Sequence, residues 1–306
     1  MRIAHISDLH LCGKYKKNNI ERTELLIRHA LDNGVQHFVI TGDISDNADE
    51  NDFLVFKEIL RKYDLLSSEK TTIVIGNHDI FGGPQTAQDV YNFPSKCMLV
   101  NYNDKVSIFI NCFKELFVNA IFPNEEMYFP FLKVFKDTLL IGFNSIDHYS
   151  RFKNPFASNG KVSKLQIKAL KHLISAQEFK EKIKIALVHH HFYKKDMVAK
   201  SSKSTLWNKI ENFTMKLRGK KNLINFFEDN NVKLVLHGHS HEMIDYFRKG
   251  IRCINAGGSI ENESSNEIGL YIIDAFPFDL SVTLSPVLLN PNEDVNKPDI
   301  VNSVAI

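Results

Sequence analysis

The chain has 306 residues, of which 43% are hydrophobic and 24% are charged, and this composition excludes a largely disordered protein. Its 38 Lys and Arg residues against 36 Asp and Glu residues leave a net charge of +2, which provides no overall attraction to nucleic acid or anionic lipid. No apolar run approaches the roughly 18 residues that a membrane-spanning helix needs, so we expect no membrane span.

The N-terminus and the cysteines both favour a cytoplasmic protein. The first ten residues, MRIAHISDLH, contain His5 and Asp8, which interrupt the apolar stretch that a secretory signal requires. The four cysteines are widely spaced and form no CxxC pair. We therefore expect reduced thiols and no zinc site built on cysteine.

The first part of the chain alternates short apolar runs with amphipathic stretches. The apolar runs predict buried strands at residues 2–6, 35–41, 71–75, 138–143, 183–188 and 232–237. Apolar residues at helical spacing predict helices at residues 19–32, 50–62, 163–176 and 220–230. Ser163 is the expected N-cap of the third helix. This alternation is typical of an α/β layered fold.

Two regions depart from this alternation. Residues 81–135 are irregular and rich in aromatic residues, and we expect a partly helical insertion that packs on the core or caps a site. Later, short β-like runs at residues 243–247, 251–255, 268–274 and 280–288 predict a mixed or antiparallel sheet that closes the domain. Residues 290–306, with two prolines and several asparagines, are expected to form a tail.

A polar cluster follows each of five predicted strands. These clusters are Asp8-Leu9-His10, Gly42-Asp43-Ile44-Ser45-Asp46, Gly76-Asn77-His78-Asp79, His189-His190-His191 and Gly238-His239-Ser240-His241. Each one alone has an ordinary explanation as a turn or a solvated loop, with Asp46 as a helix N-cap. However, loops at the carboxyl ends of strands in an α/β sheet gather at one edge. The five clusters hold seven of the thirteen histidines, so we expect them to converge.

The residue types in these clusters predict a pair of metal ions. Carboxylate oxygens and imidazole nitrogens, with no thiolate, indicate Mn, Fe, Zn or Ni. Two ions a few Å apart need a ligand that bridges them, and a carboxylate such as Asp43 has two oxygens for this purpose. Asn77 can add a neutral carbonyl oxygen, which limits the negative charge of the site.

In this order, the motifs DxH, GDxxD, GNHD, a histidine cluster and GHxH resemble the calcineurin-like metallophosphoesterase superfamily. The resemblance covers roughly residues 1–275. The segments GKVSKLQIKALKHLI, KIALVHHH, VLHGHSH and INAGGS are most similar to its class III cyclic nucleotide phosphodiesterase branch. The resemblance implies a four-layer α/β/β/α sandwich of two mixed sheets flanked by helices. It also implies one domain over residues 1–275, including the insertion or cap at 81–135, with a strand and tail at 276–306 packed on it.

The resemblance also implies roles for individual residues. The implied metal ligands are Asp8, His10 and His241 for one ion, Asn77, His190 and His239 for the other, and Asp43 between them. Because Phe192 stands where the family usually has proline, His189 remains the alternative to His190. The implied catalytic residues are His78, which contacts the phosphate and assists the leaving group, and Asp79, which orients His78. Asn255 is implied to support the site.

The activity implied is the hydrolysis of a phosphoester by a hydroxide that bridges two metal ions, with Mn or Fe expected and Zn as the alternative. The expected substrate is a phosphodiester or phosphomonoester of a nucleotide-like or other small molecule.

A nuclease of the same superfamily is the second hypothesis, since the segment from Lys194 to Lys221 has nine basic and two acidic residues, a local charge of +7. A non-catalytic interaction module is the third. The oligomeric state stays open.

Overall fold

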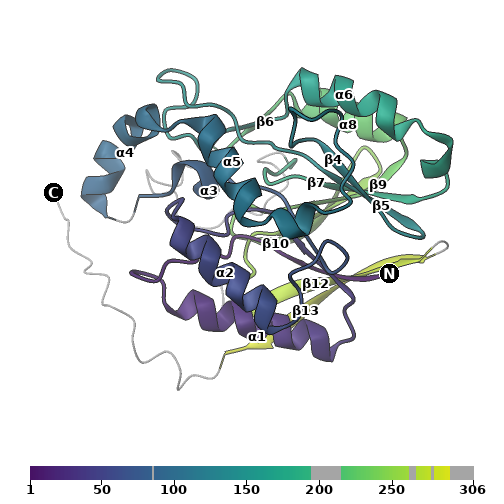
Figure 1. Ribbon diagram of the computed structural model, residues 1–306, viewed down its shortest axis with the longest axis horizontal. Coiled ribbons are helices and arrows are strands. Elements are labelled where there is room, and N and C mark those ends of the chain that lie inside the picture. The colour runs from purple at the N-terminus through teal and green to yellow at the C-terminus, as the bar shows by residue number, and fades with distance from the viewer. Residues whose placement is uncertain (85, 194–214, 262–266, 277–278, 290–306) are drawn as a thin grey trace.

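The structure is a computed structural model that describes residues 1–84, 86–193, 215–261, 267–276 and 279–289 (Figure 1). The larger part of the basic segment, residues 194–214, and the predicted tail at 290–306 lie outside the described residues. None of the helices in the described ranges is long and apolar enough to span a membrane.

The first sheet has five strands in the order β13-β12-β1-β2-β3. Strands β1, β2 and β3 run parallel, whereas β12 is antiparallel to β1 and β13 is antiparallel to β12. These strands are β1 (Arg2–Ile6), β2 (His37–Ile40), β3 (Thr71–Ile73), β12 (Glu267–Phe276) and β13 (Asp279–Leu288). The late β-like runs at 268–274 and 280–288 therefore extend the sheet that the N-terminal strand begins.

The second sheet has six strands in the order β10-β11-β9-β7-β5-β4. Its four inner strands are parallel, and β10 and β4 are antiparallel edge strands. These strands are β4 (Phe131–Val134), β5 (Thr138–Gly142), β7 (Ile183–Leu187), β9 (Val232–His237), β10 (Met243–Arg248) and β11 (Ile251–Ala256). A separate parallel pair joins β6 (Gly160–Lys161) to β8 (Leu217–Arg218).

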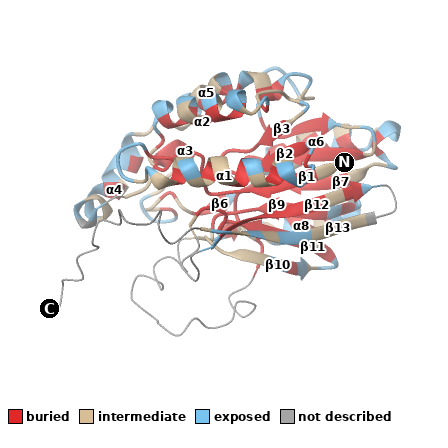
Figure 2. Cartoon of the chain, turned by 90° about the horizontal axis from the view of Figure 1, so that it is seen from below, coloured by how far each residue is buried: buried red, intermediate tan, exposed pale blue. Residues whose placement is uncertain are grey.

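Alternation of side chains along the second sheet divides the interior into two cores. Because successive side chains of a strand point to opposite faces, Leu140 of β5 joins the core with the first sheet, while Leu139 and Ile141 join the core on the other side. Helices α1 (Asn18–Asp32) and α2 (Glu50–Lys62) belong to the first core. Helices α6 (Lys164–Ile174) and α8 (Lys220–Asp229) belong to the second. The predicted fold of two mixed sheets flanked by helices is confirmed, and Figure 2 shows the buried strands between half-exposed helices.

The segment at 81–135 is largely helical and contributes to the core. It follows the short helix α3 (His78–Phe81) and contains α4 (Ala87–Leu99), α5 (Tyr102–Cys112) and the 3₁₀ helix η1 (Lys114–Phe117) before it ends in β4. On α5, the buried ring of Phe109 contacts Phe53 of α2 edge-on, with ring centroids 5.6 Å apart. Part of the aromatic content of this segment therefore packs on α2. Its assignment as an insertion stays a prediction.

The N-cap residues of two predicted helices can be compared with the structure. The Ser163 hydroxyl accepts a hydrogen bond from the Gln166 backbone N–H at 3.2 Å, which confirms Ser163 as the N-cap of α6. The ordinary explanation of GDxxD, with Asp46 as a helix N-cap, does not hold, because the N-cap of α2 is Asp49, whose carboxylate accepts from the Asn51 N–H. Asp46 instead lies in the polar cluster described below.

Strand β4 was not predicted because Lys133 interrupts its apolar pattern. Lys133 is buried, and its ammonium group donates to the backbone carbonyls of Ser68 at 3.2 Å and Thr71 at 2.7 Å. Burial lowers the pKa of Lys133 to about 7, since removal from water disfavours the charged form. Protonation of Lys133 therefore lowers the stability of the folded chain relative to the unfolded chain.

We expect the wild-type chain to become more stable between pH 7 and pH 9, and we expect Lys133→Met to abolish this increase. The unfolded chain, with a lysine pKa of about 10.4, binds more protons than the folded chain above pH 7, so the free energy of unfolding should increase by about 2 kcal/mol between pH 7 and pH 9. Urea denaturation at the two pH values measures this difference, with the exposed Lys171→Met as the control. An equal rise in wild type and Lys133→Met would contradict a neutral buried lysine.

Candidate metal centre

The five predicted clusters come together at one edge of the two sheets. The loops after the parallel neighbours β1 and β2 are joined by a hydrogen bond from the Asp8 N–H to the Gly42 carbonyl at 3.1 Å. The loops after β7 and β9 are joined in the same way, from the Gly238 N–H to the His189 carbonyl at 3.0 Å. The topology therefore brings residues that are far apart in the sequence into contact.

The backbone of these loops is held in an uncommon conformation. Five site residues have positive φ, which non-glycine residues rarely adopt: Asp8 (56°), His10 (45°), Asp43 (52°), His239 (78°) and His241 (49°). The loops are also tightly apposed, since a Cβ on Gly42 would lie 2.7 Å from both His189 Nδ1 and the Gly76 nitrogen. Concentrated strain of this kind is typical of functional sites.

The first cluster consists of Asp8, His10 and His241. The Nε2 atoms of His10 and His241 lie 3.1 Å apart. Asp8 Oδ1 lies 3.9 Å from His10 Nε2 and 3.8 Å from His241 Nε2. These three ligand-type atoms are within 4.8 Å of one another and could hold a metal ion.

The second cluster consists of Asp43, His189 and His239, with Asn77 beside them. His189 Nε2 lies 3.0 Å from Asn77 Oδ1 and 3.2 Å from His239 Nδ1. The group of Asp43, His189 and His239 also has the spacing of a metal site. This cluster is fully enclosed, because each of its members is buried.

The structure brings His189, and not His190, into the second cluster. The two ring nitrogens of His190 face away from the cluster, with Nδ1 2.9 Å from Ser145 Oγ and Nε2 3.3 Å from the Ser158 carbonyl. Adjacent residues of an extended chain point to opposite sides, so only one of the two imidazoles can face Asn77. The preference for His190 over His189 therefore does not agree with this geometry.

Asp43 lies between the two clusters. Its Oδ2 atom is 3.2 Å from His189 Nε2 and 4.0 Å from His10 Nε2. Its Oδ1 atom accepts a hydrogen bond from the His78 backbone N–H at 2.8 Å, which fixes the carboxylate. Burial would raise the pKa of Asp43, but the neighbouring imidazoles, chiefly His189, hold it well below its usual range. Asp43 is therefore an ionised carboxylate placed where a bridging ligand would lie.

Outer hydrogen bonds aim the imidazoles into the clusters. His189 Nδ1 lies 2.8 Å from the Thr41 carbonyl, which can only accept, so the proton is on Nδ1 and Nε2 faces the cluster. His10 Nδ1 lies 3.0 Å from Asp46 Oδ1 and leaves its Nε2 toward His241 in the same way. Partners of this kind orient histidines that bind metals. The residues present therefore fit the donor set of a two-metal site.

The electrostatics of the second cluster favour a cation. Burial alone would lower the pKa of His189, but the negative charges of Asp43 and Asp8 and the Thr41 carbonyl raise it to about 9. Positive charge at this point is thus stabilised by the surrounding carboxylates. A metal ion would gain from the same carboxylates.

His78 and His241 form the accessible side of the centre. The side chains of His78 and His241 are 22% and 35% exposed, whereas that of Asp43 is 1% exposed. His78 Nδ1 lies 3.0 Å from the Asp46 carbonyl oxygen, and its ring stands edge-on to His10 with centroids 4.6 Å apart. A substrate can therefore reach the clusters from the side of these two imidazoles.

The Asp79 carboxylate accepts hydrogen bonds from the backbone of two loops. Its Oδ1 accepts from the backbone N–H groups of Ile44 at 2.8 Å and Ser45 at 3.0 Å, and its Oδ2 accepts from that of Gly76 at 2.8 Å. Asp79 therefore ties the loops after β2 and β3 together, and its predicted role in orienting His78 stays a prediction. Burial and the charge of Asp43 raise the pKa of Asp79 to about 7.

Two residues outside the predicted ligand set support the centre. Asp46 contacts His10 as above, and its Oδ1 lies 3.6 Å from His78 Nδ1 and 3.3 Å from Lys16 Nζ. The GDxxD motif was the sequence signal for this residue, but its ordinary explanation was a helix cap. Asn255 donates to Ser240 Oγ and accepts from the Gly257 N–H at 3.0 Å, and so supports the loop that carries His239 and His241.

Comparison with known proteins agrees with this fold and site. Residues 1–243 match the family model of the calcineurin-like phosphoesterases, and the chain belongs to this family. It is accordingly a phosphoric ester hydrolase of a family that depends on two metal ions, and its described residues include candidate metal-binding groups. No curated protein sequence matches the chain significantly.

Solved structures show the same fold at low identity. The chain is similar to a dimetal phosphatase from Danio rerio, with 10% identity, a TM-score of 0.59 and coverage of 93% of this chain and 95% of that one. It is also similar to the purple acid phosphatase PPD1 from yellow lupin (Lupinus luteus), with 13% identity, a TM-score of 0.58 and coverage of 93% of this chain. The chain spans about half (51%) of that phosphatase. At such identities the similarity shows the fold alone.

Proposed function

We propose that this protein hydrolyses a small phosphoester at two metal ions held by the two clusters. Asp8, His10 and His241 would hold one ion, and Asn77, His189 and His239 would hold the other, with Asp43 shared. The observation that carries this proposal is the position of Asp43 Oδ2, which is 3.2 Å from one cluster's imidazole and 4.0 Å from the other's.

When bound, the two ions would lower the pKa of water and neutralise the negative charge of the phosphoryl group. The residues of this chain would supply the rest. His78 is the 22% exposed imidazole at the mouth of the centre. Its Nδ1–H donates to the Asp46 carbonyl, so its Nε2 can donate to a phosphoryl or leaving-group oxygen when the ring is protonated on both nitrogens. Asp79 would act through the backbone, by fixing the loop that carries Asp43.

The donor set supports Mn or Fe, with Zn as the alternative, since oxygen and imidazole ligands suit these ions. The proposed substrate is a phosphodiester or phosphomonoester of a nucleotide-like or other small molecule. Cytoplasm is the proposed location, and the four cysteines support it because all four are free thiols.

The test is a panel of substrates given to metal-free protein reconstituted with Mn²⁺, Fe²⁺ or Zn²⁺. The panel comprises bis(p-nitrophenyl) phosphate, p-nitrophenyl phosphate, cyclic AMP and single-stranded DNA. Turnover of one of the small esters above the rate on DNA supports the proposal. Preferential cleavage of DNA would favour a nuclease, and no turnover with any metal would favour a non-catalytic module.

His78→Ala should keep both metal ions but lower turnover of bis(p-nitrophenyl) phosphate by about 100-fold or more, the usual contribution of general acid catalysis. The reason is that alanine retains the backbone N–H that fixes the Asp43 carboxylate and removes only the imidazole. Elemental analysis and steady-state kinetics measure the two effects. The exposed His172→Ala is the control, and loss of metal from His78→Ala would make His78 a ligand instead.

A further inference from the structure

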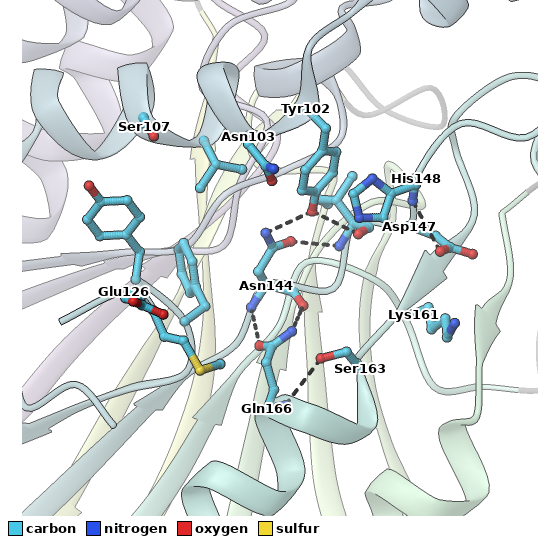
Figure 3. Close-up of a pocket in the computed structure, with 15 residues that line it drawn as sticks. Tyr102, Asn103, Ser107, Glu126, Asn144, Asp147, His148, Lys161, Ser163 and Gln166 are labelled. Carbon is cyan, nitrogen blue, oxygen red and sulfur yellow. Dashed lines mark hydrogen bonds between the residues drawn. The ribbon is translucent and has the colours of Figure 1, made fainter. Parts of the chain in front are cut away.

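A cavity of about 430 Å³ has none of the proposed metal ligands in its lining. Figure 3 shows it between α5 and the loop that follows β5. Its lining includes Tyr102, Val106 and Ser107 of α5, and Asn144 and Ile146 of the loop after β5. Its volume falls within the range of about 300–1,000 Å³ that is typical of small-molecule sites.

One wall of the cavity is preformed by a hydrogen-bonded network. The Asn144 N–H donates to Gln166 Oε1 at 3.1 Å, and the Gln166 amide donates back to the Asn144 carbonyl at 2.8 Å. The Asn144 amide also donates to the Tyr102 hydroxyl at 2.9 Å, and that hydroxyl donates to the Ile146 carbonyl at 3.0 Å. The network joins α5, the loop after β5 and α6, so the cavity does not depend on a ligand to form.

Two contacts connect the cavity to the metal centre. Ser145, between two lining residues, places its hydroxyl 2.9 Å from His190 Nδ1, and the His190 ring lies 4.3 Å from that of His239. On the other side, the ring of Phe81 lies 6.1 Å from Tyr102, and Phe81 ends the four-residue helix that begins with His78. Ser145 and His190 thus lie between the cavity and the second cluster, and Phe81 lies between the cavity and His78.

The lining combines aromatic faces with polar edges. The Tyr102 ring packs on His148 with centroids 4.1 Å apart, and Tyr128 and Phe129 line another part of the cavity. Ser107 and Asn103 add a hydroxyl and an amide. Flat aromatic faces favour a planar ring, and hydroxyl and amide groups favour its polar edges or a sugar hydroxyl.

We infer that this cavity is the subsite for the organic group of the phosphoester, and that it selects a ring-bearing, nucleoside-like alcohol over a small alkyl alcohol. The inference rests on the proposed function, because it needs the phosphoryl group at the two clusters. It assigns substrate selection to α5, which belongs to the segment at 81–135, and to the loop after β5.

The experiment compares two diesters that release the same p-nitrophenolate. These are thymidine 5′-(p-nitrophenyl phosphate) and methyl p-nitrophenyl phosphate, given to the metal-reconstituted protein. Because binding of remote groups increases kcat/KM, we expect the thymidine ester to be favoured by at least about tenfold. Ser107→Trp should fill the cavity and remove this preference, while turnover of the methyl ester stays within about twofold of wild type.

Two further variants make the result decisive. Asp104→Trp, at an exposed α5 position outside the lining, places the same bulk elsewhere and should keep the preference. Tyr128→Ala should raise KM for the thymidine ester alone, and it replaces Ser107→Trp if that variant turns over neither ester. Turnover of both esters by wild type at equal rates, or an equal loss for both in the variants, overturns the inference alone. A wild type that cleaves neither ester overturns the proposed function and the inference with it.

Discussion

Asp43→Asn is expected to lower turnover of bis(p-nitrophenyl) phosphate by well over about 100-fold, since loss of an outer partner alone commonly costs 10–100-fold in metal affinity or activity. The substitution preserves shape but removes the negative charge that lies between the two clusters. The amide has one neutral oxygen and an NH₂ group in place of the second oxygen, so it cannot both accept from the His78 N–H and supply a negatively charged oxygen between the clusters. Metal content should fall below that of wild type.

Far-UV circular dichroism and thermal unfolding of Asp43→Asn would show whether its fold is retained. The exposed Asp32→Asn, at the end of α1, is the matched control for the same chemical change and should keep full activity. Turnover by Asp43→Asn at the wild-type rate would show that this carboxylate does not bridge the ions.

His189→Gln and His190→Gln are expected to differ sharply although the two residues are adjacent. His189 Nε2 is 3.0 Å from Asn77 Oδ1, within the second cluster, so its loss should reduce the metal content to about one ion per chain and turnover by more than about 100-fold. His190 is held by Ser145 and Ser158, so its replacement should retain two ions. Elemental analysis and kinetics on both variants measure the difference.

The pair of variants contains its own control, because both remove one buried imidazole from the same strand end. Both variants are measured at a temperature well below their unfolding midpoints, so that differences in stability do not affect the comparison. Loss of metal from His190→Gln with full metal in His189→Gln would reverse the assignment and restore the ligand implied by the sequence.

The layered fold and the convergence of the loops could be predicted because both depend on local patterns. Buried parallel strands appear as continuous apolar runs. Five of these runs are followed by the polar clusters that form the site. Strand β4 could not be recognised because its third residue, Lys133, is charged in water, and only burial beside two carbonyls explains its place in a strand.

The choice between His189 and His190 depends on a register of one residue, which three consecutive histidines do not reveal. The structure favours His189 as the ligand, because the strand end directs the Nδ1 of His189 toward the Thr41 carbonyl and that of His190 toward Ser145. The cavity was also beyond sequence reasoning. Its lining comes from α5, residues 126–129, the loop after β5 and α6, and no motif marks their meeting point. The roles of Asp46 and Asp79 likewise follow from contacts between loops that are distant in sequence.

The most direct test of a two-metal centre is the metal content of the purified protein, measured by elemental analysis together with anomalous diffraction from crystals. The account predicts about two ions per chain, with one anomalous peak beside Asp8, His10 and His241, a second beside Asn77, His189 and His239, and Asp43 in contact with both. Protein that binds no metal after reconstitution, or anomalous peaks remote from Asp43, would contradict it.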